Sequence, residues 1–159
     1  MIPDRLLVEA EALLAACRAG GIMLATAESC TGGLITAELT AIAGSSDVVD
    51  RGFIIYSNEA KHELAGVPMQ LIQHHGAVSK EVACAAGALA RSRANITIAV
   101  NGVAGPGGGS AEKPVGLVCF GITQKGGEVA TEQRVFAGDR TAVRVAAVAH
   151  TFAMVRARV

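Results

Sequence analysis

A short apolar run that ends in a polar turn and is followed by a helical pattern is the feature that most limits how this chain can fold. The run, residues 22–27, has the length and character of a strand that is buried on both faces. Gly32 and Gly33 follow it, and apolar residues then recur at helical spacing, namely Leu34, Ile35, Leu39 and Ile42. The segment therefore predicts a strand, a turn that carries Ser29, and a helix.

Helices and strands alternate along most of the remaining chain, and two strands near its end form a predicted hairpin. The hairpin joins residues 115–123 to 128–136 through a Gln-Lys-Gly-Gly turn. The other expected elements are a first helix at 4–18, a strand at 53–56, a brief helix capped by Asn58, a helix capped by Ser79, a strand at 96–100 and a final helix capped by Asp139. This order implies an α/β fold in which helices cover both faces of a mixed β-sheet.

Length and charge restrict the class of protein. The 159 residues fit one compact domain over positions 1–159. Lys and Arg together equal Asp and Glu together, 14 against 14, so the positive field expected of a nucleic-acid-binding protein is missing. Hydrophobic residues make up 51% of the chain and charged residues 18%, which leaves little polar surface for a monomer and favours a homo-oligomer.

Several signals of location and metal binding are absent from the sequence. No apolar run approaches the roughly 20 residues that cross a bilayer, and the acidic first helix is unlike a secretory signal. The histidines have no metal-ligand spacing with the cysteines, which lie apart and without C-x-x-C spacing at positions 17, 30, 84 and 119. We therefore expect a cytoplasmic protein with no membrane association and no metal site.

Ser29 is a candidate nucleophile because of its position on the strand-to-helix turn. Backbone N–H groups at a helix start have no partners within the helix, so they can stabilise a developing oxyanion. The groups expected to do so come from Cys30, Thr31, Gly32 and Gly33. The alternative is that Ser29 only caps the helix. Cys30 is a rival nucleophile on the same turn, although no histidine stands in an evident activating relation to it.

A serine hydroxyl needs a base, and the segment Tyr56 to Lys61 offers a phenol and an amine at a second strand end. If the two strands are parallel neighbours, both polar turns lie at the same edge of the sheet. Lys61 would take the Ser29 proton, and Tyr56 would relay a proton or orient the amine. The alternatives are a solvated lysine and a tyrosine that only packs. For Glu28, a structural hydrogen-bonding role is expected.

A glycine-rich loop after the 96–100 strand is a second candidate site. It matches neither nucleotide-binding glycine motif, but its backbone can still form an anion nest. Arg140 or Arg144, at the start of the last helix, could fold against the loop. The residues that would hold a phosphate there are Gly105, Gly107, Gly108, Gly109, Ser110, Lys113 and Arg140. A flexible surface loop is the alternative.

Several segments of the chain together resemble the CinA C-terminal domain family. They are T-A-E-S-C-T-G-G at 26–33, G-S-S-D at 44–47, Y-S-N-E-A-K at 56–61, H-G-A-V-S at 75–79, G-V-A-G-P-G-G-G at 102–109, K-P-V-G at 113–116 and F-x-G-D-R at 136–140. The resemblance covers almost the whole chain. It implies a three-layer α/β/α sandwich with no metal or organic cofactor. Longer members of the family carry an additional molybdopterin-binding-like domain, so this chain is similar to the stand-alone form.

The resemblance also implies an activity, the hydrolysis of nicotinamide mononucleotide (NMN) to nicotinic acid mononucleotide and ammonia in pyridine-nucleotide recycling. It carries over Ser29 as nucleophile, Lys61 as base and Tyr56 as its assistant. Asn101 departs from the family pattern, which usually has threonine there, so an amide in a ligand-facing position would alter substrate binding. Two alternatives stay open: a non-catalytic nucleotide-binding or regulatory module that uses the same pocket, and an amidase for another amide.

Overall fold

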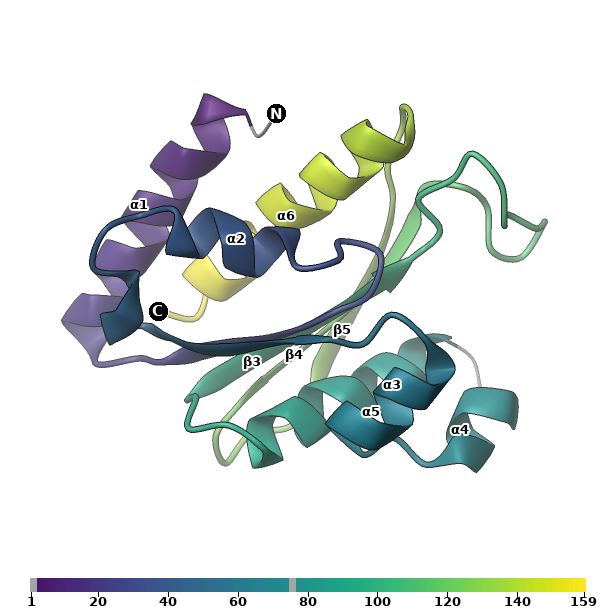
Figure 1. The fold of residues 1–159 in the computed structure, drawn as a ribbon, viewed down its shortest axis with the longest axis horizontal. Helices are drawn as coiled ribbons and strands as arrows, with labels where there is room; N and C mark the ends of the chain where they lie inside the picture. The colour runs from purple at the N-terminus through teal and green to yellow at the C-terminus, as the bar shows by residue number, and fades with distance from the viewer. Residues whose placement is uncertain (1–2, 75–76) are drawn as a thin grey trace.

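A computed structural model describes residues 3–74 and 77–159 (Figure 1). Its centre is a five-stranded sheet in the order β2-β1-β3-β4-β5. The strands are β1 (Leu24–Glu28), β2 (Val49–Ile54), β3 (Ile96–Gly102), β4 (Leu117–Gln124) and β5 (Ala130–Val135). β1 is parallel to both of its neighbours, whereas β4 is antiparallel to β3 and to β5. The expected mixed sheet with a C-terminal hairpin is confirmed.

Helices cover both faces of this sheet (Figure 1). One face carries α1 (Asp4–Gly20), α2 (Leu34–Thr40) and α6 (Arg140–Arg156), which enclose the larger apolar core with Leu14, Phe120 and Val148 at its centre. The other face carries α3 (Asn58–Ala65), α4 (Met69–His74) and α5 (Ala77–Ala90), which enclose a smaller core. A 3-10 turn, η1 (Ser45–Asp47), precedes β2. The predicted three-layer α/β/α sandwich is therefore the observed fold.

Four predicted boundaries were wrong. β2 occupies 49–54 rather than 53–56, because pairing with β1 overrides the weak strand propensity of Asp50 and Gly52. Ser57, not Asn58, caps α3, since its hydroxyl accepts from the Ala60 amide at 3.0 Å. α2 ends at Thr40, before Ile42, and α5 begins at Ala77 rather than at Ser79. His75 and Gly76, the start of one motif quoted above, lie outside the described residues.

Parallel pairing brings the ends of three strands together, as the sequence predicted for the first two. The Ile55 amide donates to the Glu28 carbonyl at 2.8 Å, and the Ser29 amide donates to the Val100 carbonyl at 2.9 Å. The chain therefore leaves β1 between the ends of β2 and β3, at the edge where ligands bind in open α/β sheets. Within the described residues no helix is long and apolar enough to span a membrane.

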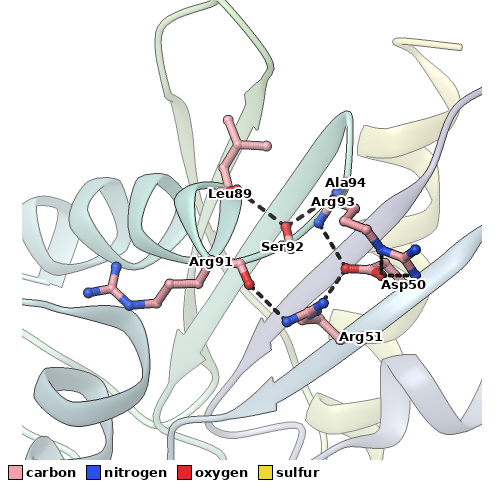
Figure 2. Close-up of polar contacts among 7 residues, drawn as sticks. All are labelled: Asp50, Arg51, Leu89, Arg91, Ser92, Arg93 and Ala94. Carbon is pink, nitrogen blue, oxygen red and sulfur yellow. Dashed lines mark hydrogen bonds and ion pairs between the residues drawn. The ribbon is translucent and has the colours of Figure 1, made fainter.

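A buried carboxylate ties the edge strand β2 to the loop between α5 and β3 (Figure 2). Asp50 accepts from Arg51 Nε at 2.7 Å, from the Arg93 amide at 2.9 Å and from Arg93 Nε at 3.1 Å. Arg51 in turn donates to the Arg91 carbonyl at 3.0 Å. The Asp50 side chain is only 1% exposed, and these hydrogen bonds hold its pKa below the ordinary value, with the Arg93 amide as the largest cause.

Replacing Asp50 by Asn should lower the free energy of unfolding by about 1–3 kcal/mol, because charge-assisted hydrogen bonds are lost in a buried place. Since folding lowers the pKa of Asp50, its stabilisation is present above the unfolded value of about 3.9 and is lost as the pH falls through the folded value. Urea unfolding of both proteins at pH 7 and pH 3 measures the difference. Asp47→Asn is the matched control, because its side chain is 65% exposed; an equal loss in both variants would contradict the role of Asp50.

Candidate active site

A cleft of about 330 Å³ opens at the edge of the sheet where β1, β2 and β3 end. It gathers the candidate nucleophile, the candidate base and two further cations. The lining residues are Ser29, Cys30, Tyr56, Asn58, Lys61, Lys80, Asn101, Gly102, Ala104 and Arg140. A larger groove of about 670 Å³ lies between α5 and the β4–β5 hairpin. The smaller cleft is the better candidate because reactive groups from separate elements converge in it.

Ser29 and Lys61 lie in this one cleft although they are 32 positions apart in the sequence. Ser29 follows β1 and is 5% exposed, and Lys61 lies on α3 and is 4% exposed. The first turn of α3 is fixed by Ser57, whose carbonyl accepts from the Lys61 amide at 3.1 Å. A lysine that is buried to this extent is uncommon. The structure therefore does not place Lys61 on a solvated helix face.

The Glu28 carboxylate fixes the turn that carries Ser29. Its oxygens accept from the amides of Gly33 at 3.0 Å, Ile35 at 3.0 Å and Thr36 at 2.9 Å, so Glu28 caps the start of α2. The hydroxyls of Thr26 and Thr36 donate to it as well, at 3.1 and 2.8 Å. The structural hydrogen-bonding role expected for Glu28 is confirmed.

This arrangement changes the expectation for the oxyanion donors. The Gly33 amide is bound to Glu28, and the Gly32 amide donates to the Ser29 carbonyl at 3.0 Å, so neither points to a substrate. Gly33 rather than Ser29 is the N-cap of α2, and its φ of 97° suits only glycine. Cys30 and Thr31 lie beside Ser29, and their amides make no hydrogen bond to another described residue. These two amides are the remaining candidates.

Two arginines of α6 brace the loops around the cleft. Arg144 donates from Nε to the Cys30 carbonyl at 3.1 Å and from Nη2 to the Thr31 carbonyl at 2.9 Å. Arg140 donates from Nη1 to the Gly105 carbonyl at 2.9 Å and from Nη2 to the Tyr56 hydroxyl at 3.4 Å. The predicted contact between Arg140 and the glycine-rich loop is confirmed. Arg144 contacts the Ser29 turn instead.

The rest of the glycine-rich loop does not line the cleft. Gly107, Gly108 and Gly109 are exposed, and the loop extends beyond the sheet (Figure 1). The Ser110 amide donates to the Lys113 carbonyl at 2.9 Å, and the Lys113 amide donates to the Ser110 hydroxyl at 3.0 Å. Ser110 and Lys113, two of the residues that were expected to hold a phosphate, therefore close a turn at the end of the loop. Within residues 3–74 and 77–159 no cluster of His, Cys, Asp and Glu could hold a metal ion.

Comparison with known proteins gives the family. The model of the CinA C-terminal domain matches residues 8–159. The chain is 53% identical over 135 residues to nicotinamide-nucleotide amidohydrolase PncC of Enterobacter agglomerans, covering 84% of this chain and 82% of that protein. The Escherichia coli K12 protein of the same name is 45% identical over 152 residues, 94% of this chain and 92% of that one.

The chain belongs to the CinA C-terminal domain family. Among solved structures, competence/damage inducible protein CihA from Agrobacterium tumefaciens has a TM-score of 0.93 at 46% identity, with 99% of this chain and 97% of that chain covered. A putative competence-damage inducible protein of Caldicellulosiruptor bescii is 50% identical over 143 residues. Those residues are 89% of this chain but only 34% of that protein.

Sequence reasoning missed two charged residues of this CinA domain, Lys80 and Glu81. Lys80 lines the cleft from α5, and burial is the largest cause that lowers its pKa, followed by the positive charges of Lys113 and Lys61. Glu81 is buried beside it, at 1% exposure. A Lys-Glu pair inside a helix of otherwise small and apolar residues was the available signal.

Cys30 is a poor rival to Ser29 as nucleophile. Burial raises the pKa of its thiol to about 12, and the nearby Glu81 carboxyl adds to the shift. The thiolate is the reactive form of cysteine, so this thiol stays protonated and unreactive at neutral pH.

Replacing Glu28 by Gln should lower the free energy of unfolding by about 2–4 kcal/mol, because an amide nitrogen would face donors that now meet a carboxylate oxygen. Glu38→Gln is the matched control. Glu38 is also fully buried, on α2, but neither of its oxygens has a partner among the described residues, and burial raises its pKa. The control should be neutral or more stable in urea unfolding at pH 7. Equal losses of unfolding free energy in the two variants would show that the hydrogen bonds from the start of α2 to Glu28 do not stabilise the fold.

Proposed function

We propose that this protein is a nicotinamide-nucleotide amidase, which hydrolyses NMN to nicotinic acid mononucleotide and ammonia and so serves pyridine-nucleotide recycling. The observation that carries the proposal is the burial of Ser29 and Lys61 in one cleft at the edge of the sheet. The names of the PncC relatives, which align over more than four fifths of this chain, support the same reaction. A buried hydroxyl and a buried amine are the parts of a Ser/Lys hydrolase.

In the proposed mechanism, the neutral amine of Lys61 takes the proton of Ser29 while Oγ attacks the carboxamide carbon. The Cys30 and Thr31 amides stabilise the negative oxygen of the tetrahedral intermediate. The C–N bond then breaks, and Lys61 returns the proton to the departing nitrogen, which leaves as ammonia. Water attacks the acyl-enzyme along the reverse proton path, so the acid is released and Ser29 is restored. Tyr56 assists from the mouth of the cleft.

The phosphate of NMN is assigned to Lys80 and Arg140. Both line the cleft, whereas Ser110 and Lys113 do not. Of the glycine-rich loop, only Gly105 takes part in this proposal, because its carbonyl accepts a hydrogen bond from Arg140 and so helps to fix that side chain. Arginine and lysine are the side chains that bind phosphate most strongly. Asn101 also lines the cleft, where its amide would meet the nicotinamide or ribose portion.

Ser29→Ala should abolish ammonia release from NMN, since the attacking atom is removed. Lys61→Ala should lower kcat by about 10²–10⁴-fold with little change in NMN binding, the range that general-base catalysis supplies. A coupled assay for ammonia measures turnover, and calorimetric titration measures binding. Lys125→Ala is the control, because Lys125 lies outside the cleft, and it should keep activity.

Three results would contradict this assignment. Wild-type turnover from Ser29→Ala protein would end the role of Ser29 as nucleophile. Heat of NMN binding with no ammonia from the wild-type protein would favour a non-catalytic nucleotide-binding module instead. Ammonia from other amides but not from NMN would assign the same chemistry to another substrate.

Lys80→Ala should raise KM for NMN by about 10-fold or more, because a charge-assisted hydrogen bond to phosphate is worth roughly 1.5–3 kcal/mol. The same variant should scarcely change KM for nicotinamide riboside, which lacks the phosphate. Lys125→Ala, outside the cleft, is the comparison and should change neither value greatly. An equal rise in KM for both substrates would show that Lys80 does not contact the phosphate.

A further inference from the structure

Glu81 is a buried carboxyl that the mechanism above does not use. It lies on α5 at 1% exposure, and neither carboxyl oxygen has a hydrogen-bond partner among the side chains that the structure describes. Burying a carboxyl without partners destabilises a protein, so such a group in a native fold needs an explanation.

Close backbone packing fixes the position of Glu81 beneath the cleft. A Cβ atom added at Gly121 of β4 would lie 2.7 Å from the Glu81 carbonyl oxygen, so only glycine lets α5 approach the sheet there. Two turns later, a Cβ atom added at Gly87 would clash with the Ala65 carbonyl of α3. The helix that carries Glu81 is therefore held against both the sheet and the helix that carries Lys61 (Figure 1).

The charges that face Glu81 are those of two lysines of the cleft, Lys61 from α3 and Lys80 from α5. Asn101 of β3 also lies close to it, although its amide is outside hydrogen-bonding geometry. The other titratable neighbours are three buried thiols whose pKa burial raises, Cys30 and Cys84 to about 12 and Cys119 in the same direction. Because these thiols stay neutral, the two lysines are the charges that Glu81 meets.

Among the described side chains, no carboxylate makes an ion pair with Lys61 within 4 Å, Glu81 included. A charge that forms on Lys61 therefore interacts with Glu81 through a buried region, where screening is weaker than in water. The chemistry of the cleft creates such a charge at each proton transfer, because Lys61 becomes an ammonium when it takes the Ser29 proton.

We propose that Glu81 is a positioning residue for the reaction: its carboxylate, which makes no direct hydrogen bond, stabilises through the buried interior the ammonium that Lys61 becomes. This inference rests on the proposed function. The proton moves from Ser29 Oγ to Lys61 Nζ and on to the leaving nitrogen, and Glu81 neither gains nor loses it. Burial raises the pKa of Glu81 to about 8, against the influence of Lys61, Asn101 and Lys80. The active carboxylate is therefore lost as the pH falls through about 8.

The pH dependence of kcat/KM for NMN from pH 6 to 10 tests the role. Wild-type activity should fall as the pH drops below about 8. In Glu81→Gln, maximal kcat should drop by about 10-fold or more, and the fall in activity near pH 8 should move to lower pH by at least about half a unit, because no carboxyl is left at position 81 to be protonated. Glu81→Asp should keep the acid limb in its original range. Glu38 is the other buried carboxyl without a partner among the described residues. Its variant Glu38→Gln should have the same kcat and pH dependence as the wild type.

A second measurement does not depend on NMN. Brief labelling with acetic anhydride at a series of pH values, read by mass spectrometry, reports the reactivity of the Lys61 amine. At the same pH, labelling of Lys61 should be faster in Glu81→Gln than in the wild type and unchanged in Glu38→Gln. If the wild-type protein releases no ammonia from NMN, the proposed function fails, and this labelling still decides whether Glu81 acts on Lys61.

Folding stability supplies the remaining check. Since folding raises the pKa of Glu81, its contribution is most favourable below the unfolded value of about 4.3 and is lost as the pH rises through about 8. Glu81→Gln should therefore melt at a higher temperature than the wild type at pH 9, with a smaller difference at pH 5. A variant that is more stable but less active is expected where a carboxyl is buried for function at the expense of stability.

Superimposable pH profiles and labelling curves in Glu81→Gln and wild type would overturn the proposal. An equal shift in Glu38→Gln would overturn it as well.

Discussion

The Glu28 carboxylate is the interaction on which the arrangement of the cleft depends. It ends β1 and, through four donors of residues 33–36, holds the start of α2, so the residues between them form a tight turn with one geometry. Ser29 is the first residue of that turn. The carboxylate also uses the amides that would otherwise attract an anion. As a result, the donors left beside Ser29 are few: the amides of Cys30, which lines the cleft, and of Thr31.

Parallel pairing supplies the second requirement, which is to bring remote segments to one place. The ends of β2, β1 and β3 lie side by side, so the segments that follow them meet although they are far apart in the sequence. The Asp50 cluster lies at the opposite end of the same strands, where it anchors β2 to the loop before β3 (Figure 2). The cleft and the Asp50 cluster thus lie at opposite ends of the same strands.

The sequence predicted the sheet, both helical layers and the meeting of Ser29 with Lys61, because strand ends and apolar periodicity are local signals. It failed for β2, where Asp50 and Gly52 read as turn residues; the pairing that makes them a strand comes from β1, a remote segment. It also failed for Lys80 and Glu81. Their role follows from the face that α5 turns to the sheet, which a helix of small residues does not reveal. The direction of the glycine-rich loop, whose Ser110 and Lys113 do not line the cleft, could not be predicted because composition does not give a loop's direction.

The buried thiol of Cys30, beside the proposed nucleophile Ser29, has a consequence for inhibitor chemistry. With a pKa of about 12, Cys30 is ionised to only about one part in 10⁵ at pH 7. Alkylating reagents that select for thiolates will therefore pass over a sulfur that lines the same cleft as Ser29. Covalent compounds for this domain need electrophiles that acylate or phosphonylate a hydroxyl, and their selectivity over cysteine hydrolases is built into the protein.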